Sequence, residues 1–322
     1  MTYTYSSSIE KVESMIGRSV RRDISRMLQH AKGGLASAVQ AILEHPNPHV
    51  GIVTGFYIEF GEPPSPETDG LGGTAHMAAA LAAAGIAVTV ITDAPCAKAV
   101  WAIVDAIPEE VDLEVVAVSE KSVRRLRKRL EDAAHPLTHL IAIERVSPGS
   151  DGKPHREHGW DMTRQTAPLH LLFDEGGWNR PWTTIGIGDG GNEIGMGSLP
   201  QEIIDRDIPN GALIAATTPT DHLIVAGVST WGGYGVVAAL ALASKDRSIE
   251  LKKYLNRPFD LSVLKAAVEI GQATDDSRVD RPGTLQMSVD RLGWEEHAVL
   301  IDELRAIMDS VPVLDTTAEA QL

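Results

Sequence analysis

The stretch Thr183–Glu193 reads TTIGIGDGGNE, and its two halves differ in character. The first part, Thr183–Asp189, is an apolar, β-rich run typical of a buried strand. The second half, Asp189–Glu193, is a glycine-rich turn that carries acidic and amide side chains. In open parallel sheets, ligands bind beyond the carboxyl ends of the strands, where such turns lie. We therefore predict a strand that leads directly into a functional loop.

Five further apolar runs have the same form, and helical stretches separate them. The runs are His49–Phe56, Ala87–Asp93, Leu113–Val118, His139–Arg145 and Ala212–Thr217. The helical stretches cover about 72–84, 96–107, 119–133, 158–174 and 191–206. Strands that alternate with helices predict βαβ units and a parallel sheet, and near-continuous Val/Ile runs fit strands covered on both faces.

No obvious linker divides the chain, so we predict a single α/β domain with three parts. A helical N-terminal segment covers residues 1–48, a parallel-sheet core covers 49–220, and a mainly helical part covers 221–322. The loop at 146–165 is rich in Gly, His and charged residues, and we interpret it as a lid. Residues 314–322 have the composition of a frayed tail.

The composition is globular, with an excess of acidic residues. The 322 residues include 44 Asp and Glu against 29 Lys and Arg, which gives a formal net charge of −15. An acidic surface argues against nucleic acid and anionic membranes as partners. No apolar stretch reaches the roughly 20 residues that span a bilayer, and Met1–Ser8 lacks the order of a signal peptide. We therefore expect a cytoplasmic location.

Acidic and polar residues follow strand after strand at the edge where the predicted sheet binds ligands. They are Thr54, Glu67, Asp69, Asp93, Glu144, Asp189, Glu193, Thr217 and Asp221. Crowded carboxylates raise each other's pKa unless a cation joins them, and oxygen ligands suit Mg²⁺, Mn²⁺ or Ca²⁺. Each acidic residue could instead cap the helix that follows it. As a set, they favour a divalent-metal site.

The run Gly186–Gly191 also matches the G-x-G-x-x-G pattern of dinucleotide-binding turns. Asp189 inside this turn would repel a pyrophosphate, and no acidic residue ends a strand about 20 positions later. A dehydrogenase that uses NAD is therefore an alternative rather than the main hypothesis. We interpret the glycines as a turn that brings Asp189, Asn192 and Glu193 close to an ion or a substrate.

Several of these segments together resemble the D-glutamate cyclase C-terminal-like family. The motifs are Thr54-Gly55-Phe56, Glu67-Thr68-Asp69-Gly70, Ile143-Glu144-Arg145, Ile185–Gly197 (IGIGDGGNEIGMG) and Ala226-Gly227-Val228-Ser229 followed by Trp231-Gly232. They span about residues 30–240, which is most of the chain. The resemblance implies a three-layer α/β/α sandwich and a Mn²⁺ or Mg²⁺ ion. It also implies lyase chemistry that converts D-glutamate to 5-oxo-D-proline with loss of water.

The sequence departs from the pattern of this family at three places. Val146 follows Glu144-Arg145 where the relatives have Pro-Gly, Leu71 follows Asp69-Gly70 where they have Pro, and Thr230 replaces Asn before Trp-Gly. The first and last differences could alter the substrate pocket. They therefore bear on the identity of the substrate more than on metal binding.

A hypothesis for the site assigns a role to each candidate residue. The metal ligands are Glu67, Asp69, Glu144, Asp189 and Asp221. The catalytic residues are Asp189, Asn192, Arg145 and Glu193, with Glu193 as the proton shuttle. The substrate-binding residues are Thr54, Gly190, Gly191, Arg164 and Thr217. Arg145 or Arg164 would pair with the substrate's α-carboxylate, and the amides at Gly190 and Gly191 would contact the developing oxyanion.

Two functions from other classes fit the same acidic edge. A divalent-metal-dependent phosphatase or other hydrolase would act on a small phosphorylated metabolite. A non-catalytic binding protein would be stabilised by its small-molecule ligand without turnover. In the cyclase hypothesis the partner is an amino acid. The apolar segment 223–244 fits either a central helix or the interface of a homo-oligomer.

Overall fold

The centre of the fold is a six-stranded parallel sheet with the strand order β5-β4-β1-β6-β7-β8. The computed structural model describes residues 2–20, 22–59, 64–173, 181–244, 246–275 and 286–311, so the tail predicted at 314–322 lies outside the described residues. The strands are β1 (His49–Thr54), β4 (Ala87–Asp93), β5 (Asp112–Val116), β6 (His139–Ile143), β7 (Thr183–Gly188) and β8 (His222–Val225).

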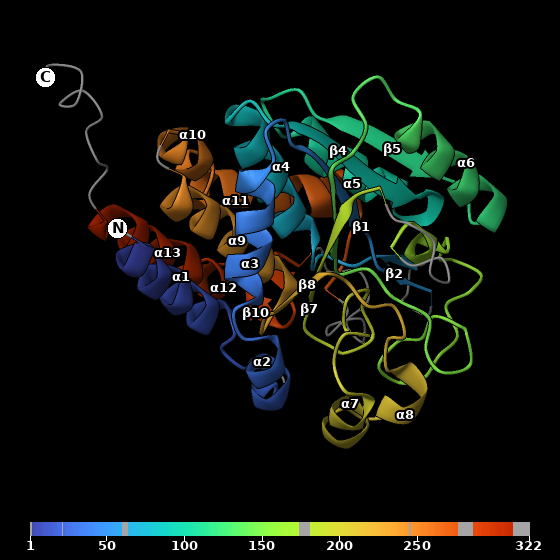
Figure 1. Ribbon diagram of the computed structural model, residues 1–322. Coiled ribbons are helices and arrows are strands. Elements are labelled where there is room, and N and C mark those ends of the chain that lie inside the picture. The colour runs from blue at the N-terminus through green and yellow to red at the C-terminus, as the bar shows by residue number, and fades with distance from the viewer. Residues whose placement is uncertain are drawn as a thin grey trace, which may run out of the picture.

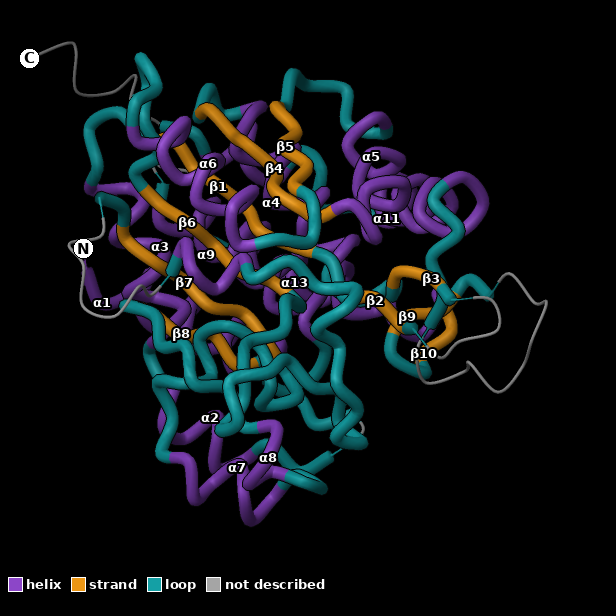
Figure 2. The backbone as a smooth tube through the Cα atoms, turned by 90° about the vertical axis from the view of Figure 1, so that its right-hand side faces the viewer, coloured by secondary structure: helices purple, strands orange, loops and turns teal. Residues whose placement is uncertain are grey.

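Two short antiparallel ribbons stand outside this sheet. They are β2 (Tyr57–Ile58) with β3 (Ser65–Pro66), and β9 (Ser288–Val289) with β10 (Leu292–Gly293). Figure 2 shows the two ribbons side by side, away from the central strands. A hydrogen bond from the Thr68 hydroxyl to the Ser288 carbonyl (2.9 Å) joins them. This contact connects the segment after β1 with a hairpin more than 200 residues later in the chain.

Helices cover both faces of the sheet. The helices before β8 are α1 (Thr2–Ile16), α2 (Ser25–Ala31), α3 (Gly34–Glu44), α4 (Leu71–Ala83), α5 (Ala97–Asp105), α6 (Glu120–Glu131), α7 (Gln201–Asp207) and α8 (Gly211–Ile214). The helices after it are α9 (Ser229–Ala243), α10 (Ser248–Lys252), α11 (Arg257–Lys265), α12 (Trp294–His297) and α13 (Val299–Ser310). Figure 1 shows α3, α4 and α9 on one side of the sheet and α6 on the other. This arrangement confirms the predicted three-layer α/β/α fold.

Side chains alternate between the two layers, as the period of a strand requires. Val50 and Ile52 of β1 belong to the larger core with α4 and α9, whereas Val53 belongs to the smaller core under α6. In β6, Ile141 faces the larger core and Leu140 the smaller one. The strands are therefore buried on both faces, which explains why their sequences read as continuous apolar runs.

The sixth predicted strand, Ala212–Thr217, is wrong. Its first residues lie in α8, which packs against α7, and the sixth strand is β8 at His222–Val225. The sheet therefore extends past the predicted core boundary at residue 220. A short apolar run is ambiguous because a buried strand and a buried helix have the same hydrophobic pattern over a few residues.

The helices predicted at 158–174 and 191–206 are also wrong over most of their length. Up to Phe173, the first segment forms turns and only one short 3₁₀ turn, Leu169–Leu172. In the second segment a helix begins only at Gln201. Both segments instead form loops beyond the carboxyl ends of the strands. No helix among the described residues has both the length and the apolar character that crossing a membrane requires.

Helices α4 and α9 pack closely because glycines lie where they cross. A Cβ atom added at Gly233 would lie 2.5 Å from the Gly73 Cα atom, which is too close for a backbone contact. We expect Gly233→Ala to lower the free energy of unfolding by about 1–3 kcal/mol, because an extra methyl group must push the helices apart. Chemical denaturation of the variant measures this change.

Gly293 provides the matched control for this substitution. A Cβ atom added there meets nothing within 4 Å, and its φ of −60° suits any residue. Gly293→Ala should change the stability by no more than about 0.5 kcal/mol. Equal stabilities of the Gly233→Ala and Gly293→Ala proteins would contradict the tight crossing of α4 and α9.

Candidate functional site

The order of the strands reverses between β1 and β6. The chain proceeds from β1 to β4 and β5 on one side of the sheet, and from β6 to β7 and β8 on the other. Connections that diverge in this way leave a crevice beyond the carboxyl ends of the two strands, where ligands of α/β proteins bind. The acidic turn that follows β7 lies next to this point, and so does the segment that follows β1.

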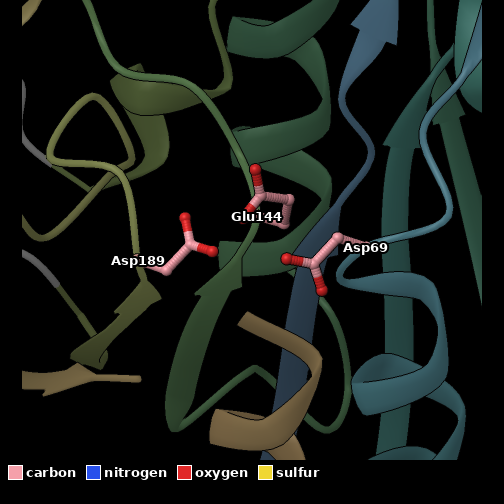
Figure 3. A group of neighbouring side chains, drawn as sticks. All are labelled: Asp69, Glu144 and Asp189. Carbon is pink, nitrogen blue, oxygen red and sulfur yellow. The ribbon is translucent and has the colours of Figure 1, made fainter. Parts of the chain in front are cut away.

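Three carboxylates from three connections converge at this crevice. Asp69 precedes α4, Glu144 directly follows β6, and Asp189 directly follows β7. Each offers an oxygen that lies within 4.8 Å of the oxygens offered by the other two. Figure 3 shows the three carboxyl groups pointing toward one another. The structure thus brings together three of the five residues that the sequence nominated as metal ligands, and Glu67 lines the same small cavity, of about 30 Å³.

Glu144 is held in a strained and buried position. Its φ of 44° lies in the left-handed region that residues with a side chain rarely adopt. Its side chain is almost completely buried, and no described residue donates a hydrogen bond to Oε2. Burial, followed by the charges of Asp69 and Glu193, raises the pKa of Glu144 well above its usual range. Strain and an unsatisfied buried carboxylate at one residue are typical of a functional site.

Asp69 caps the N-terminus of α9. Its Oδ1 accepts hydrogen bonds from the backbone and the hydroxyl of Thr230 and from the Gly70 amide, and its Oδ2 accepts one from the Ser229 amide. Burial raises the pKa of Asp69, and the donors of Thr230 oppose this rise. Asp69 is therefore a helix cap, but it caps α9 and not α4, the helix that follows it in the chain and that the sequence alternative concerned. The cap also fixes the carboxylate at the positive end of the helix dipole.

Glu193 closes the turn that begins at Asp189. Its Oε1 accepts hydrogen bonds from the amides of Asp189 (3.1 Å) and Gly190 (2.6 Å). Its Oε2 is buried and receives no hydrogen bond from the described part of the chain. The sequence suggested that the Gly190 amide contacts a developing oxyanion. In the structure this amide donates instead to Glu193, inside the turn. Burial and the charge of Glu144 raise the pKa of Asp189 well above its usual range.

Asn192 ties this turn to the loop 146–165. Its side-chain amide donates to the His155 carbonyl (2.8 Å), and its own carbonyl accepts from the Ser147 amide (2.8 Å). Thr217 supports the same loop, because its backbone and hydroxyl both donate to the Pro148 carbonyl at 2.9 Å. The loop is therefore anchored along one side of the acidic cavity.

The structure places both predicted arginines away from the acidic cavity. Arg145 is 1% exposed and donates to the carbonyl of Gly55, the carbonyl of Ala167 and the carboxylate of Asp93. Its charge is therefore paired inside the protein. Arg164 is exposed and lines a second cavity of about 770 Å³, between the loop 146–165 and the start of α6. Neither residue lines the acidic cavity.

Two other nominated residues have local structural surroundings. Asp221 lies at the amino end of β8, opposite to the acidic cavity, and its Oδ2 accepts from the backbone and hydroxyl of Thr184. It does not join the group. Thr54 is fully buried at the end of β1, and its carbonyl accepts from the Thr92 hydroxyl (2.9 Å). Gly191, with a φ of 89°, provides the left-handed residue of the turn.

Three residues that the sequence reasoning missed line the acidic cavity: Arg22, Glu157 and Asp290. Asp290 has a φ of 44°, is 2% exposed, and contributes to raising the pKa of Asp189. It occupies the two-residue turn between β9 and β10, so the polar pair Asp290-Arg291 between Val289 and Leu292 was the available signal. Its hairpin is held by long-range hydrogen bonds, from the Thr68 hydroxyl to the Ser288 carbonyl and from the Arg291 amide to Asp275, which no local pattern reveals.

Comparison with known proteins gives two findings. The profile of a family described as "D-glutamate cyclase-like, C-terminal" matches residues 12–305. A curated human (Homo sapiens) protein named "D-glutamate cyclase, mitochondrial" is 33% identical over 244 residues. The match covers 73% of this chain but 39% of the human protein, so the chain spans well under half of that relative.

Proposed function

The chain belongs to the D-glutamate cyclase-like family, and we propose that it is a metal-dependent lyase that converts D-glutamate to 5-oxo-D-proline with loss of water. The observation that supports this proposal most directly is the convergence of Asp69, Glu144 and Asp189 at the crevice between β1 and β6. The second cavity is also lined by charged side chains, but the group of acidic side chains found close enough together to hold a metal ion among the described residues lies in the acidic cavity.

The residues of the acidic cavity fit a divalent metal ion. All the candidate ligands are carboxylate oxygens, which Mg²⁺ and Mn²⁺ prefer. The buried Oε2 of Glu144 receives no hydrogen bond from the described residues, and a cation would satisfy it. We propose that Asp69, Glu144 and Asp189 hold the ion, with Glu67 and Asp290 beside them. When bound, the ion would act as a Lewis acid on the carboxyl group that reacts.

The proposed reaction requires proton transfers that a carboxylate can perform. The amine of the substrate attacks the carbon of the γ-carboxyl group in the same molecule, so that a C–N bond forms and a C–O bond breaks. Two of the three ammonium protons leave with one carboxyl oxygen as water. We assign both transfers to Glu193, because backbone amides hold its Oε1 and leave Oε2 to accept each proton and pass it on.

Water must be limited at the site, because the reverse reaction is a hydrolysis. The hydrogen bonds of Asn192 with His155 and Ser147 fix the loop 146–165 against the turn 189–193. We therefore propose that this loop shields the site and acts as a lid, as its sequence suggested.

The test of the proposed function is formation of 5-oxoproline from D- and L-glutamate, resolved by chiral chromatography. Metal-stripped protein should be inactive, and Mn²⁺ or Mg²⁺ should restore product from the D-enantiomer. Absence of product with either metal, while the metal still raises the melting temperature, would overturn the cyclase. The metal site would then be tested on phosphorylated metabolites, because the same carboxylates suit a hydrolase.

A further inference from the structure

The acidic cavity has one basic residue in its wall. Among the described residues that line it, seven are acidic and only Arg22 is basic. A metal ion can offset part of the negative charge of the site, yet the proposed substrate brings two carboxylates of its own. One of these reacts, and the other needs a partner that does not take part in the reaction.

We propose that Arg22 binds the α-carboxylate of the amino-acid substrate and that Glu157 keeps Arg22 in place before the substrate arrives. This inference rests on the proposed function, because that function supplies a substrate with a second, non-reacting carboxylate. Arg22 lies between α1 and α2, and Glu157 belongs to the loop 146–165. The two side chains form an ion pair with an Nη2–Oε2 distance of 3.2 Å.

The guanidinium group of Arg22 lies directly against the turn 189–193. A Cβ atom added at Gly190 would lie 2.9 Å from Arg22 Nη1, and at the same distance from the Asn192 and Glu193 side-chain oxygens. The absence of a side chain at residue 190 therefore makes room for the guanidinium. The charge of Arg22 also acts on the neighbouring Asp189 and lowers its pKa, against the effect of burial.

The pair of Arg22 with Glu157 suits an exchange of partners. The Arg22 side chain is 16% exposed and that of Glu157 is 26% exposed, so solvent weakens their attraction. A substrate carboxylate can accept two parallel hydrogen bonds from a guanidinium, which makes it the stronger partner. The exchange keeps the Arg22 guanidinium paired with a carboxylate, and the displaced Glu157 side chain, which is 26% exposed, is accessible to water.

The obvious alternatives for this role are engaged elsewhere. Arg145 donates to three acceptors inside the protein, one of them the carboxylate of Asp93. Arg164 opens onto the second cavity, on the side of the loop that faces α6. Arg22 therefore takes the place of Arg145 and Arg164 as the proposed partner of the substrate's α-carboxylate.

The test compares glutamate with 4-aminobutyrate, which is glutamate without its α-carboxylate. We expect Arg22→Gln to weaken binding of D-glutamate to Mn²⁺-loaded protein by about 10- to 100-fold, because a charged hydrogen-bond partner is lost. Binding of 4-aminobutyrate should stay within about threefold, since this compound makes no use of Arg22. Thermal shift and calorimetric titration measure both affinities, and Mn²⁺ alone should raise the melting temperature of the variant as in the wild type.

Arg26→Gln is the matched control. Arg26 lies four residues further on, pairs with Asp207, and is 44% exposed at a place outside the cavity. Its substitution should leave both affinities unchanged. Glu157→Gln removes the competing carboxylate and should tighten glutamate binding by a few-fold. Loss of glutamate binding in the Glu157→Gln protein would overturn the exchange of partners.

The outcomes separate this inference from the proposed function. Binding of glutamate that depends on Arg22, without formation of 5-oxoproline, would overturn the cyclase alone. Formation of 5-oxoproline with unchanged glutamate affinity in the Arg22→Gln protein would overturn the inference alone. Equal losses for glutamate and 4-aminobutyrate, or no binding of glutamate by the wild type, would also overturn the role of Arg22.

Discussion

Glu144→Gln is expected to have opposite effects on stability and on activity. Without metal, the variant should melt a few degrees above the wild type, whereas its turnover with Mn²⁺ should fall by at least about a thousandfold. The activity falls because an amide is a poor metal ligand. The stability rises because Glu144 is buried beside Asp69 and Glu193, and these charges repel its own.

The gain in stability should depend on pH. A carboxyl group whose pKa is raised by folding stabilises the fold while it is protonated, below its pKa in the unfolded chain. This contribution disappears as the pH rises through the raised pKa of the folded state. The pKa of Glu144 is raised well above 4.5, so the metal-free wild type should lose stability between about pH 5 and pH 8. The Glu144→Gln protein lacks this group, and its advantage should be larger at pH 8.

Calorimetry in the presence of a chelator, at pH 5 and pH 8, measures this difference. Glu202→Gln, an exposed substitution on α7, removes the same charge outside the cavity and serves as the control. If the metal-free Glu144→Gln protein is less stable than the wild type at pH 8, the Glu144 carboxylate makes a contact that stabilises the fold, and the expected repulsion is wrong. Retention of the Mn²⁺-induced rise in melting temperature would remove Glu144 from the metal site.

The sequence predicted the acidic group because strand direction determines where it lies. Glu144 and Asp189 directly follow parallel strands, so their carboxylates meet at one edge once those strands pair. Five of the six predicted strands form the sheet at nearly their predicted positions. The pattern of apolar runs is sufficient for these strands, since burial on both faces makes each run continuous.

Asp221 shows how one misplaced strand changes a functional prediction. With a strand at 212–217, Asp221 would follow the carboxyl end and join the acidic group. The strand lies instead at His222–Val225, so Asp221 precedes it and lies at the opposite edge of the sheet. A shift of a few residues along the chain therefore moves a side chain from one end of the strand to the other.

Arg22 and Asp290 could not be found in the same way. Neither follows a strand of the central sheet, and both belong to segments outside that sheet although they line the acidic cavity. The position of Arg22 follows from the packing of α1 and α2, between which it lies. The hairpin that carries Asp290 is held near the segment after β1 by the hydrogen bond between Thr68 and Ser288. Such contacts join residues far apart in the sequence, and local hydrophobic periodicity carries no information about them.

Glu193→Gln is expected to lower kcat by about 10²- to 10⁴-fold while the protein still binds Mn²⁺. The amide oxygen of Gln can accept the hydrogen bonds that Glu193 Oε1 receives from the amides of Asp189 and Gly190. The turn should therefore keep its shape. The amide nitrogen takes the place of Oε2 and cannot accept a proton from the substrate ammonium, so both proton transfers lose their acceptor.

The Mn²⁺-induced rise in melting temperature distinguishes this role from metal binding. We expect it to persist in the Glu193→Gln protein and to be lost in the Glu144→Gln protein, although both substitutions replace one buried carboxylate by an amide. Loss of the rise in the Glu193→Gln protein would make Glu193 a metal ligand. Persistence of the rise with unchanged kcat would remove Glu193 from the reaction. Glu144 and Glu193 line the same cavity, and both substitutions replace a carboxylate oxygen by an amide nitrogen. A general effect of the lost charge would therefore change both proteins alike.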